Sequence, residues 1–132
     1  MAARNTAVMP STQQTIAGEL VDAIVGRDFE RARGLLATDI DFRAMTPKRI
    51  WEAAGPAEVE DVLRAWLADP DEKIDSVEAT APMTVEDTQR VGWRVRGRGA
   101  DGPFVFEQQV YLRETGGRIG WLRIMCSGTR PV

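Results

Sequence analysis

The strand-rich half of the chain closes on Arg118-Ile119-Gly120-Trp121-Leu122-Arg123-Ile124, which directly follows the glycine pair Gly116-Gly117. Both glycines of the pair tolerate positive φ, so they predict a two-residue turn between strands over about 104–114 and 118–127. Alternating apolar and polar side chains predict two further strands upstream, over about 73–86 and 89–97. The C-terminal half is therefore expected to be a meander of antiparallel strands.

The first half of the chain has a helical period instead. The capping-box pattern of Ser11 with Gln14 predicts the start of a first helix, which Gly26 ends. Asp28 is a favourable N-cap for a short second helix, and Gly55-Pro56 begins a third. The apolar positions at helical spacing are Ile16, Leu20, Val21 and Ile24, then Phe29, Ala32, Leu35 and Leu36, and finally Val59, Val62, Leu63, Trp66 and Leu67.

One short strand separates the second and third helices. Ile40, Phe42 and Ala44 alternate with charged residues, and Thr46-Pro47 breaks the alternation. The segment that follows is predicted to be a loop that holds Trp51. Helices first and a meander afterwards indicate a single α+β domain over residues 15–130, with residues 1–14 as a flexible N-terminal segment.

The composition excludes several classes of site. The 132 residues carry a net charge of −3 with both signs interleaved, which predicts no nucleic-acid partner. The chain has no histidine and one cysteine, Cys126, so we expect no metal site and no disulfide. No apolar run approaches the roughly 18 residues needed to cross a membrane. The expectation is a cytoplasmic protein without a cofactor and without a membrane partner.

The glycine turn also predicts which strand residues share a face. Counting back from the turn pairs Tyr111 with Leu122, Gln109 with Ile124 and Glu107 with Cys126, all on one face of the sheet. Val91, Trp93 and Val95 are placed on the same face, and Arg94 and Arg96 on the other. A slip of one residue would invert the assignment.

The chain resembles the cone-shaped nuclear-transport-factor-2-like (NTF2-like) superfamily, in its SnoaL-like and ketosteroid-isomerase-like branch. The resemblance implies three N-terminal helices packed on the concave face of a curved, mainly antiparallel sheet, with a pocket between them and frequent homodimers. The segments that carry the resemblance are Val25-Gly26-Arg27-Asp28-Phe29-Glu30, Leu36-Ala37-Thr38-Asp39-Ile40-Asp41-Phe42, Gly55-Pro56-Ala57-Glu58-Val59 and Gly117-Arg118-Ile119.

The catalytic residues of a ketosteroid isomerase do not carry over. The resemblance places Ala44 at the position of the aspartate base, Leu20 at that of the oxyanion-hole tyrosine and Gln109 at that of the protonated acid. That chemistry needs a base to remove a proton and donors to hold the enolate oxygen. A methyl group cannot accept the proton, so an isomerase of this type is not expected.

Glu107 is the candidate catalytic residue. Facing the pocket beside Gln109 and Tyr111, it would have a raised pKa suited to acid–base work. The competing interpretation turns Glu107 to solvent or pairs it with Arg94 or Arg123 across strands. The candidate ligand-binding residues are Phe42, Ala44, Trp51, Leu63, Trp66, Trp93, Gln109, Tyr111 and Ile124.

Two functions remain open from the sequence. In the first, the pocket binds a small apolar or aromatic molecule, with acid–base activity of isomerase, cyclase or dehydratase type as its enzymatic version. In the second, side chains fill the cavity and the protein is a non-catalytic dimeric interaction module. The homodimer is expected because Phe104, Phe106, Val110, Leu112 and Trp121 are predicted to lie on the outer face of the sheet.

Overall fold

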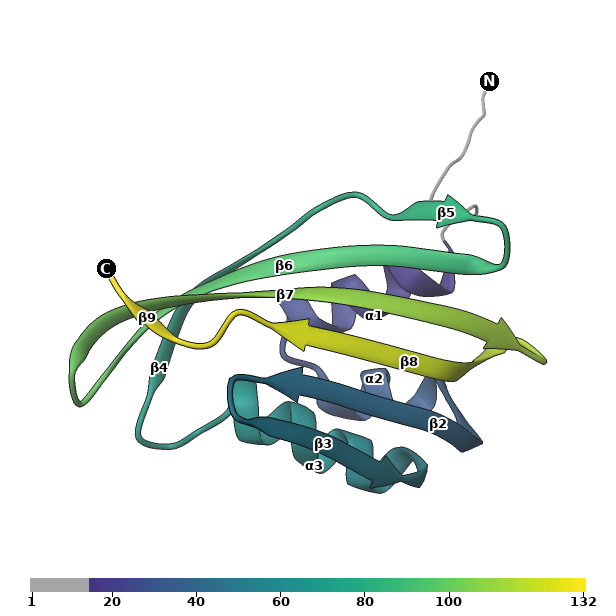
Figure 1. Cartoon of the computed structure of the whole chain (residues 1–132), viewed down its shortest axis with the longest axis horizontal. Helices are drawn as coiled ribbons and strands as arrows, with labels where there is room; N and C mark the ends of the chain where they lie inside the picture. The colour runs from purple at the N-terminus through teal and green to yellow at the C-terminus, as the bar shows by residue number, and fades with distance from the viewer. Residues whose placement is uncertain (1–14) are drawn as a thin grey trace.

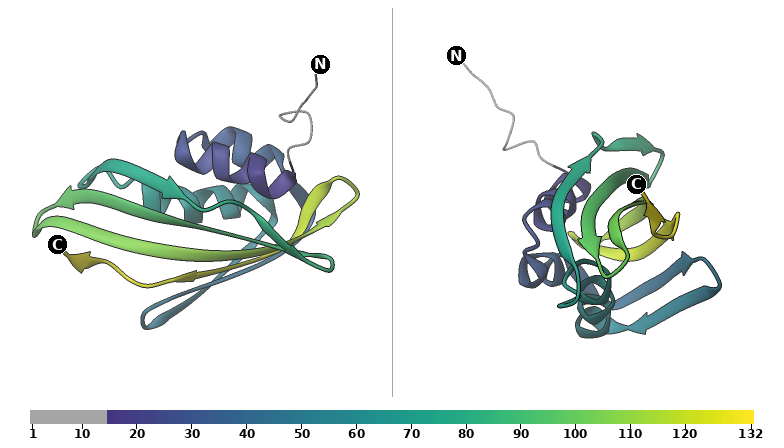
Figure 2. Two further views of the ribbon diagram at one scale, coloured as in Figure 1. Left: turned by 90° about the horizontal axis from the view of Figure 1, so that it is seen from above. Right: turned by 90° about the vertical axis from the view of Figure 1, so that its left-hand side faces the viewer.

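A computed structural model of the chain, which describes residues 15–132, shows three helices on one face of a curved sheet (Figures 1 and 2). The strand order is β3-β2-β8-β7-β6-β4, with β5 paired to β6 and β9 paired to β7. Among the strands of residues 15–132, β2 and β8 are the one pair that runs parallel. The elements are α1 (Ile16–Val25), α2 (Phe29–Gly34), β2 (Leu36–Thr46), β3 (Arg49–Ala54), α3 (Gly55–Leu67), β4 (Lys73–Ala79), β5 (Met83–Val85), β6 (Thr88–Gly99), β7 (Gly102–Thr115), β8 (Arg118–Cys126) and β9 (Arg130–Pro131). The predicted α+β class is confirmed.

The helix ends follow the sequence closely where they can be compared. The side chain of Asp28 accepts a hydrogen bond from the Arg31 N–H at 3.1 Å, so its predicted capping role is confirmed. Gly26 is the C-cap of α1, also as predicted. The helix begins at Ile16, where Thr15 caps it by accepting from the Gly18 N–H. The predicted capping box at residues 11 and 14 lies outside the described residues.

The segment expected to be a loop around Trp51 is the strand β3, so that prediction is wrong. Thr46 pairs with Arg49, and Pro47 and Lys48 form the two-residue turn between β2 and β3. Proline fixes the first central position of the turn, and Lys48 adopts a φ of 69° at the second. Thr46-Pro47 therefore ends one strand and starts a hairpin, which the proline signal alone does not distinguish from a loop.

The glycine turn between β7 and β8 is confirmed, but the register beyond it is not the predicted one. Thr115 pairs with Arg118 and Glu114 with Ile119, whereas Arg113 pairs with Trp121. Gly120 is therefore an extra residue in β8, a β-bulge, which moves every later pair by one position. A Cβ at Gly120 would lie 2.8 Å from Oγ1 of Thr115, so the bulge needs a residue without a side chain.

The bulge inverts the predicted faces of β7. The pairs are Leu112 with Leu122, Val110 with Ile124 and Gln108 with Cys126, in place of the three predicted ones. Glu107, Gln109 and Tyr111 consequently point to the outer face, away from the helices. The side chains that enter the core from β7 are Phe104, Phe106, Gln108, Val110 and Leu112.

The face of β6 is as predicted. Val91, Trp93 and Val95 are buried, and Arg94 and Arg96 are exposed on the other side. The buried residues lie opposite Val110, Gln108 and Phe106 of β7. The core of the domain therefore contains the inward side chains of both long central strands.

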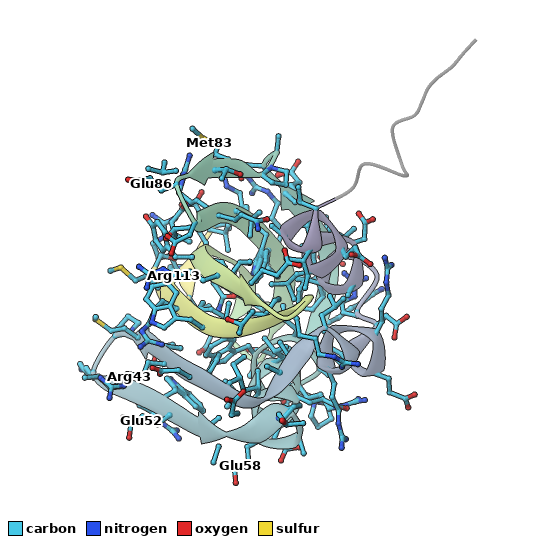
Figure 3. The ribbon with its side chains drawn as sticks, turned by 90° about the vertical axis from the view of Figure 1, so that its right-hand side faces the viewer. Arg43, Glu52, Glu58, Met83, Glu86 and Arg113 are labelled. Atoms are coloured by element: carbon cyan, nitrogen blue, oxygen red, sulfur yellow. The ribbon has the colours of Figure 1, made fainter. Side chains whose placement is uncertain are left out.

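The outer face of the sheet is charged rather than apolar. Figure 3 shows Arg113, Arg43 and Glu52 on the side of the sheet away from the helices. The guanidinium groups of Arg113 and Arg123 lie 4.1 and 4.6 Å from the ring centre of Trp121 and cover it. Four of the five residues expected to make this face apolar are instead in the core, so that part of the argument for a dimer is wrong.

The helices carry their predicted apolar stripes inward, and α3 also buries one charged group. Glu60 is 8% exposed and accepts hydrogen bonds from Arg64 Nε at 2.8 Å and from Arg33 Nη1 at 3.4 Å, so it joins α3 to α2. The hydrogen bond from Arg64 lowers the pKa of Glu60 below its ordinary value, and burial opposes that shift. No helix among residues 15–132 is long and apolar enough to cross a membrane.

Glu60→Gln should lower the free energy of unfolding by about 1–2 kcal/mol near neutral pH, because it removes a charge-assisted hydrogen-bond acceptor shared by two helices. The folded-state pKa of Glu60 lies below the unfolded-state value. Its contribution is therefore complete above the unfolded-state pKa and is lost as the pH falls through the folded-state pKa. Urea denaturation of both proteins over a pH series measures this.

Asp61→Asn, at an exposed position of the same helix, controls for the loss of a negative charge. A difference that stays constant down to strongly acidic pH would contradict the assignment.

Candidate functional site

A cavity of about 540 Å³ opens where the β2–β3 turn, the C-terminal end of α3 and the ends of β7 and β8 meet. It lies toward the left of Figure 1, where β8 ends and α3 leads into β4. The residues that line the cavity are Thr46, Pro47, Lys48, Trp51, Ala65, Trp66, Asp69, Glu72, Phe106, Gln108, Cys126, Ser127, Gly128 and Thr129. Its volume is within the range of small-molecule sites.

Trp51 and Trp66 form one wall of the cavity. Their rings meet edge to face, with centroids 5.6 Å apart and planes at 79°. Trp51 is fixed on both sides, because its Nε1–H donates to Thr46 Oγ1 at 2.8 Å and the Arg49 guanidinium lies 3.4 Å from its ring centre. The wall is therefore an ordered aromatic surface.

A buried glutamine forms the inner end of the cavity. Gln108 is 0% exposed, and its Oε1 accepts a hydrogen bond of 2.7 Å from Trp93 Nε1. An indole nitrogen can only donate, so the amide oxygen must face Trp93 and the NH₂ group must point the other way. The contact with Trp93 thus sets the orientation of the Gln108 amide.

Two buried side-chain donors of residues that line the cavity have no hydrogen-bond partner. Gln108 Nε2 and Trp66 Nε1 are the buried side-chain nitrogen or oxygen atoms among residues 15–132 that make no hydrogen bond. Leaving a buried donor unsatisfied costs about 1–3 kcal/mol, so a water molecule or another acceptor is expected at each of these groups. Both residues line the same cavity.

Two carboxylates lie at the outer end of the cavity, on the segment between α3 and β4. Glu72 is partly buried, and burial is the main cause of its raised pKa, with the charges of Asp69 and Asp71 adding to the shift. The Asp69 carboxylate also lines the cavity and accepts a hydrogen bond from the Asp71 N–H at 2.8 Å. The cavity therefore has an amide donor at its inner end and negative charge at its outer end.

The sequence matches no protein-family model, and no curated protein matches it. Solved structures do match. One is a protein from Rhodopseudomonas palustris that is provisionally named an isomerase. It is 20% identical with a TM-score of 0.62, and the match covers 86% of this chain and 87% of that one. A provisionally named polyketide cyclase from Sinorhizobium meliloti is 19% identical with a TM-score of 0.61, covering 87% and 98%.

A third structure is an LEH-like epoxide hydrolase from M. tuberculosis. It is 12% identical with a TM-score of 0.62, and the match covers 85% of this chain and 80% of that one. The fold is the NTF2-like cone. At these identities the likeness shows the fold alone, so the activity must be argued from the residues of this cone.

The cone of this chain turns the candidate catalytic residue away from its cavity. Glu107 lies on the outer face, where Arg94 donates to its Oε2 from Nη2 at 2.7 Å and from Nε at 2.8 Å. The hydrogen bond from Arg94 lowers the pKa of Glu107, opposite to the predicted direction. Gln109 also faces outward and accepts from Arg90 at 3.2 Å, and Tyr111 shares that face. The prediction that these three side chains enter the cavity is wrong.

The other predicted ligand-binding residues divide into two groups. Trp51 and Trp66 line the cavity. The rest belong to the hydrophobic core, each less than one-tenth exposed: Phe42, Ala44, Leu63, Trp93 and Ile124. Ala44 and Leu20, which align with isomerase positions, are core residues as well. Trp93 still acts on the cavity, because it orients Gln108.

Sequence analysis missed Gln108, Phe106 and Glu72 as cavity residues. The first two were assigned to the wrong face by the register error. A signal for that error was available, because an isolated glycine inside a strand pattern often marks a bulge, and Gly120 is one. Glu72 lies in a short segment after α3 whose path the sequence does not determine.

A double-mutant cycle tests the contact between Gln108 and Trp93. We expect Trp93→Phe to lower the free energy of unfolding by about 1–3 kcal/mol, because it leaves Gln108 Oε1 unsatisfied. Gln108→Leu leaves Trp93 Nε1 unsatisfied but also removes the unpartnered Nε2, so its loss should be smaller. The decrease in the free energy of unfolding of the double variant should be about 1 kcal/mol smaller than the sum of the two single decreases, since neither polar atom then remains without its partner. Urea denaturation supplies all four values. Strict additivity would show that the two side chains do not interact.

Proposed function

We propose that this protein binds a small, largely apolar or aromatic molecule that carries a hydrogen-bond acceptor, in the cavity between Trp51, Trp66 and Gln108. The observation that carries the proposal is the pair of unpartnered donors, Trp66 Nε1–H and Gln108 Nε2–H, in the walls of one cavity. A carbonyl or ether oxygen at the inner end would remove the cost of leaving them unsatisfied. The aromatic wall favours a flat, apolar body for the same molecule.

The proposal is for binding rather than for the acid–base catalysis expected of Glu107. That carboxylate is ion-paired on the outer face, so it cannot exchange a proton with a molecule in the cavity. Isomerase, cyclase and hydrolase activities are in the names of the structural relatives and are not transferred at 12–20% identity. Side chains fill the interior around Phe42, Leu63 and Trp93, and the proposal therefore concerns the cavity of about 540 Å³ beside Trp51 and Trp66.

Binding of 2-acetylnaphthalene tests the proposal. We expect a dissociation constant of about 10 µM–1 mM, and a shift of the Trp66 indole N–H resonance in NMR spectra, because the ketone oxygen accepts from that group. Loss of the resonance in Trp66→Phe assigns it. Gln108→Leu should reduce the affinity for the ketone roughly fivefold.

The matched control ligand is 2-isopropenylnaphthalene, in which a CH₂ group replaces the ketone oxygen. It has the same shape but no acceptor, so Gln108→Leu should leave its affinity unchanged. Equal affinities of the ketone and the hydrocarbon for the unaltered protein would contradict the proposed role of the donors. Binding of neither compound would contradict the pocket function itself.

We also propose that the protein forms a homodimer through an apolar row on the outer face. Ile50, Met45 and Met125 are cross-strand neighbours on β3, β2 and β8, and are 69%, 49% and 54% exposed. Contiguous exposed apolar side chains of this kind favour association, and a two-fold axis would bring the same row of two copies together. This surface differs from the one that the sequence predicted.

Light scattering coupled to size exclusion measures the mass in solution. We expect a dimer at about 50 µM, and a shift toward monomer in Met125→Glu, because a buried unpaired charge opposes association. Val85→Glu is the matched control, since Val85 is 70% exposed on β5 and outside the row. A monomeric unaltered protein, or equal effects of the two substitutions, would contradict this surface.

A further inference from the structure

The outer end of the cavity carries an excess of negative charge. Asp69 and Glu72 line it, whereas Lys48 is the one basic side chain among the lining residues. Asp71 adds a third carboxylate next to Glu72 and raises its pKa further. The charge is therefore concentrated on one segment, between the last turn of α3 and the start of β4.

The Glu72 carboxylate is held differently from those of Glu60 and Glu107, whose pKa values are lowered by arginines. Glu60 and Glu107 each accept hydrogen bonds from two arginines. The Glu72 carboxylate has neither a hydrogen bond nor an ion pair with any residue in the range 15–132, and the two charges that raise its pKa are those of Asp69 and Asp71. A partly buried carboxylate in acidic surroundings lacks the cation that would compensate its desolvation.

The inner end of the same cavity independently indicates a ligand. Gln108 is 0% exposed, its oxygen is held by Trp93, and its NH₂ group has no partner. This group requires an acceptor, and a cation cannot satisfy it. The two ends of the cavity therefore require opposite chemistries from whatever occupies it.

We propose that the ligand of this cavity is a cationic amphiphile: an apolar, flat molecule with a hydrogen-bond acceptor at one end and a protonated amine at the other. The acceptor binds at Gln108 and Trp66, and the amine binds beside the carboxylates of Glu72 and Asp69. Trp66 lines the same cavity as these two residues, and an indole ring face attracts a cation. The inference rests on the proposed binding function and adds the charge of the ligand.

A pair of ligands that differ in charge alone tests the inference. The probes are 2-acetyl-6-(aminomethyl)naphthalene and 2-acetyl-6-(hydroxymethyl)naphthalene, which have nearly the same shape and share the ketone. We expect the amine to bind roughly tenfold more tightly than the alcohol at neutral pH and low salt, measured by titration calorimetry. Glu72→Gln should reduce the amine's affinity about fivefold and leave the alcohol's unchanged.

Glu86→Gln is the matched control, because it removes the same charge from an exposed turn outside the cavity lining (Figure 3). It should change neither affinity by more than about twofold. Equal binding of amine and alcohol by the unaltered protein, or equal effects of Glu72→Gln and Glu86→Gln, would overturn the inference and leave the proposed pocket intact. Failure of both compounds to bind would overturn the pocket function as well as this inference.

Discussion

The register between β7 and β8 decides which side chains of the longest strand enter the cone. That register depends on one extra residue, Gly120. Glycine fits at this position because it has no Cβ, and the Thr115 side chain occupies the space where a Cβ would lie. The bulge turns Gln108 and Phe106 inward and Glu107 outward. Without the extra residue, the side chains of Glu107, Gln109 and Tyr111 would point inward in place of Phe106, Gln108 and Val110.

Polar side chains are paired on the outer face of the sheet, whereas several in the cavity have no partner within residues 15–132. On the outer face, arginines and carboxylates are paired across strands, as in Arg94 with Glu107 and Arg123 with Asp41. Such exposed pairs contribute little to stability, but they leave few charges without a partner. Inside the cavity the opposite holds, because two donors and the Glu72 carboxylate have no partner among the described residues. Groups left in this state cost free energy, and the proposed ligand would remove part of that cost.

Local signals predicted most of the elements. The caps at Asp28 and Gly26, the turn at Gly116-Gly117 and the strand periodicity from Lys73 onward depend on neighbouring residues, which the sequence displays directly. The single strand predicted over about 73–86 is, however, divided into β4 and β5. The strand β3 was missed because a proline that ends a strand also suits the first central position of a hairpin turn. These successes and this failure both concern interactions within a few residues.

The candidate site was harder to predict, because it depends on tertiary packing. Counting from the glycine turn put Tyr111, Gln109 and Glu107 inside, although the alternate set on β7 is more apolar: Phe104, Phe106, Val110 and Leu112. Burying those four side chains outweighs the continuity of an ideal hairpin, and the bulge is the result. The pattern of β7 was therefore better evidence for the face than the turn was. The position of Glu72 depends on how α3 packs, which no local pattern contains.

The most direct test of this account is a crystal structure of the protein soaked with 2-acetylnaphthalene. The account predicts the pairs Gln108–Cys126 and Val110–Ile124, and the ketone oxygen within hydrogen-bond distance of Gln108 Nε2 and Trp66 Nε1. A structure in which Gln109 and Glu107 enter the cone, or in which the ketone lies in the cavity with its oxygen turned away from both nitrogens, would contradict it.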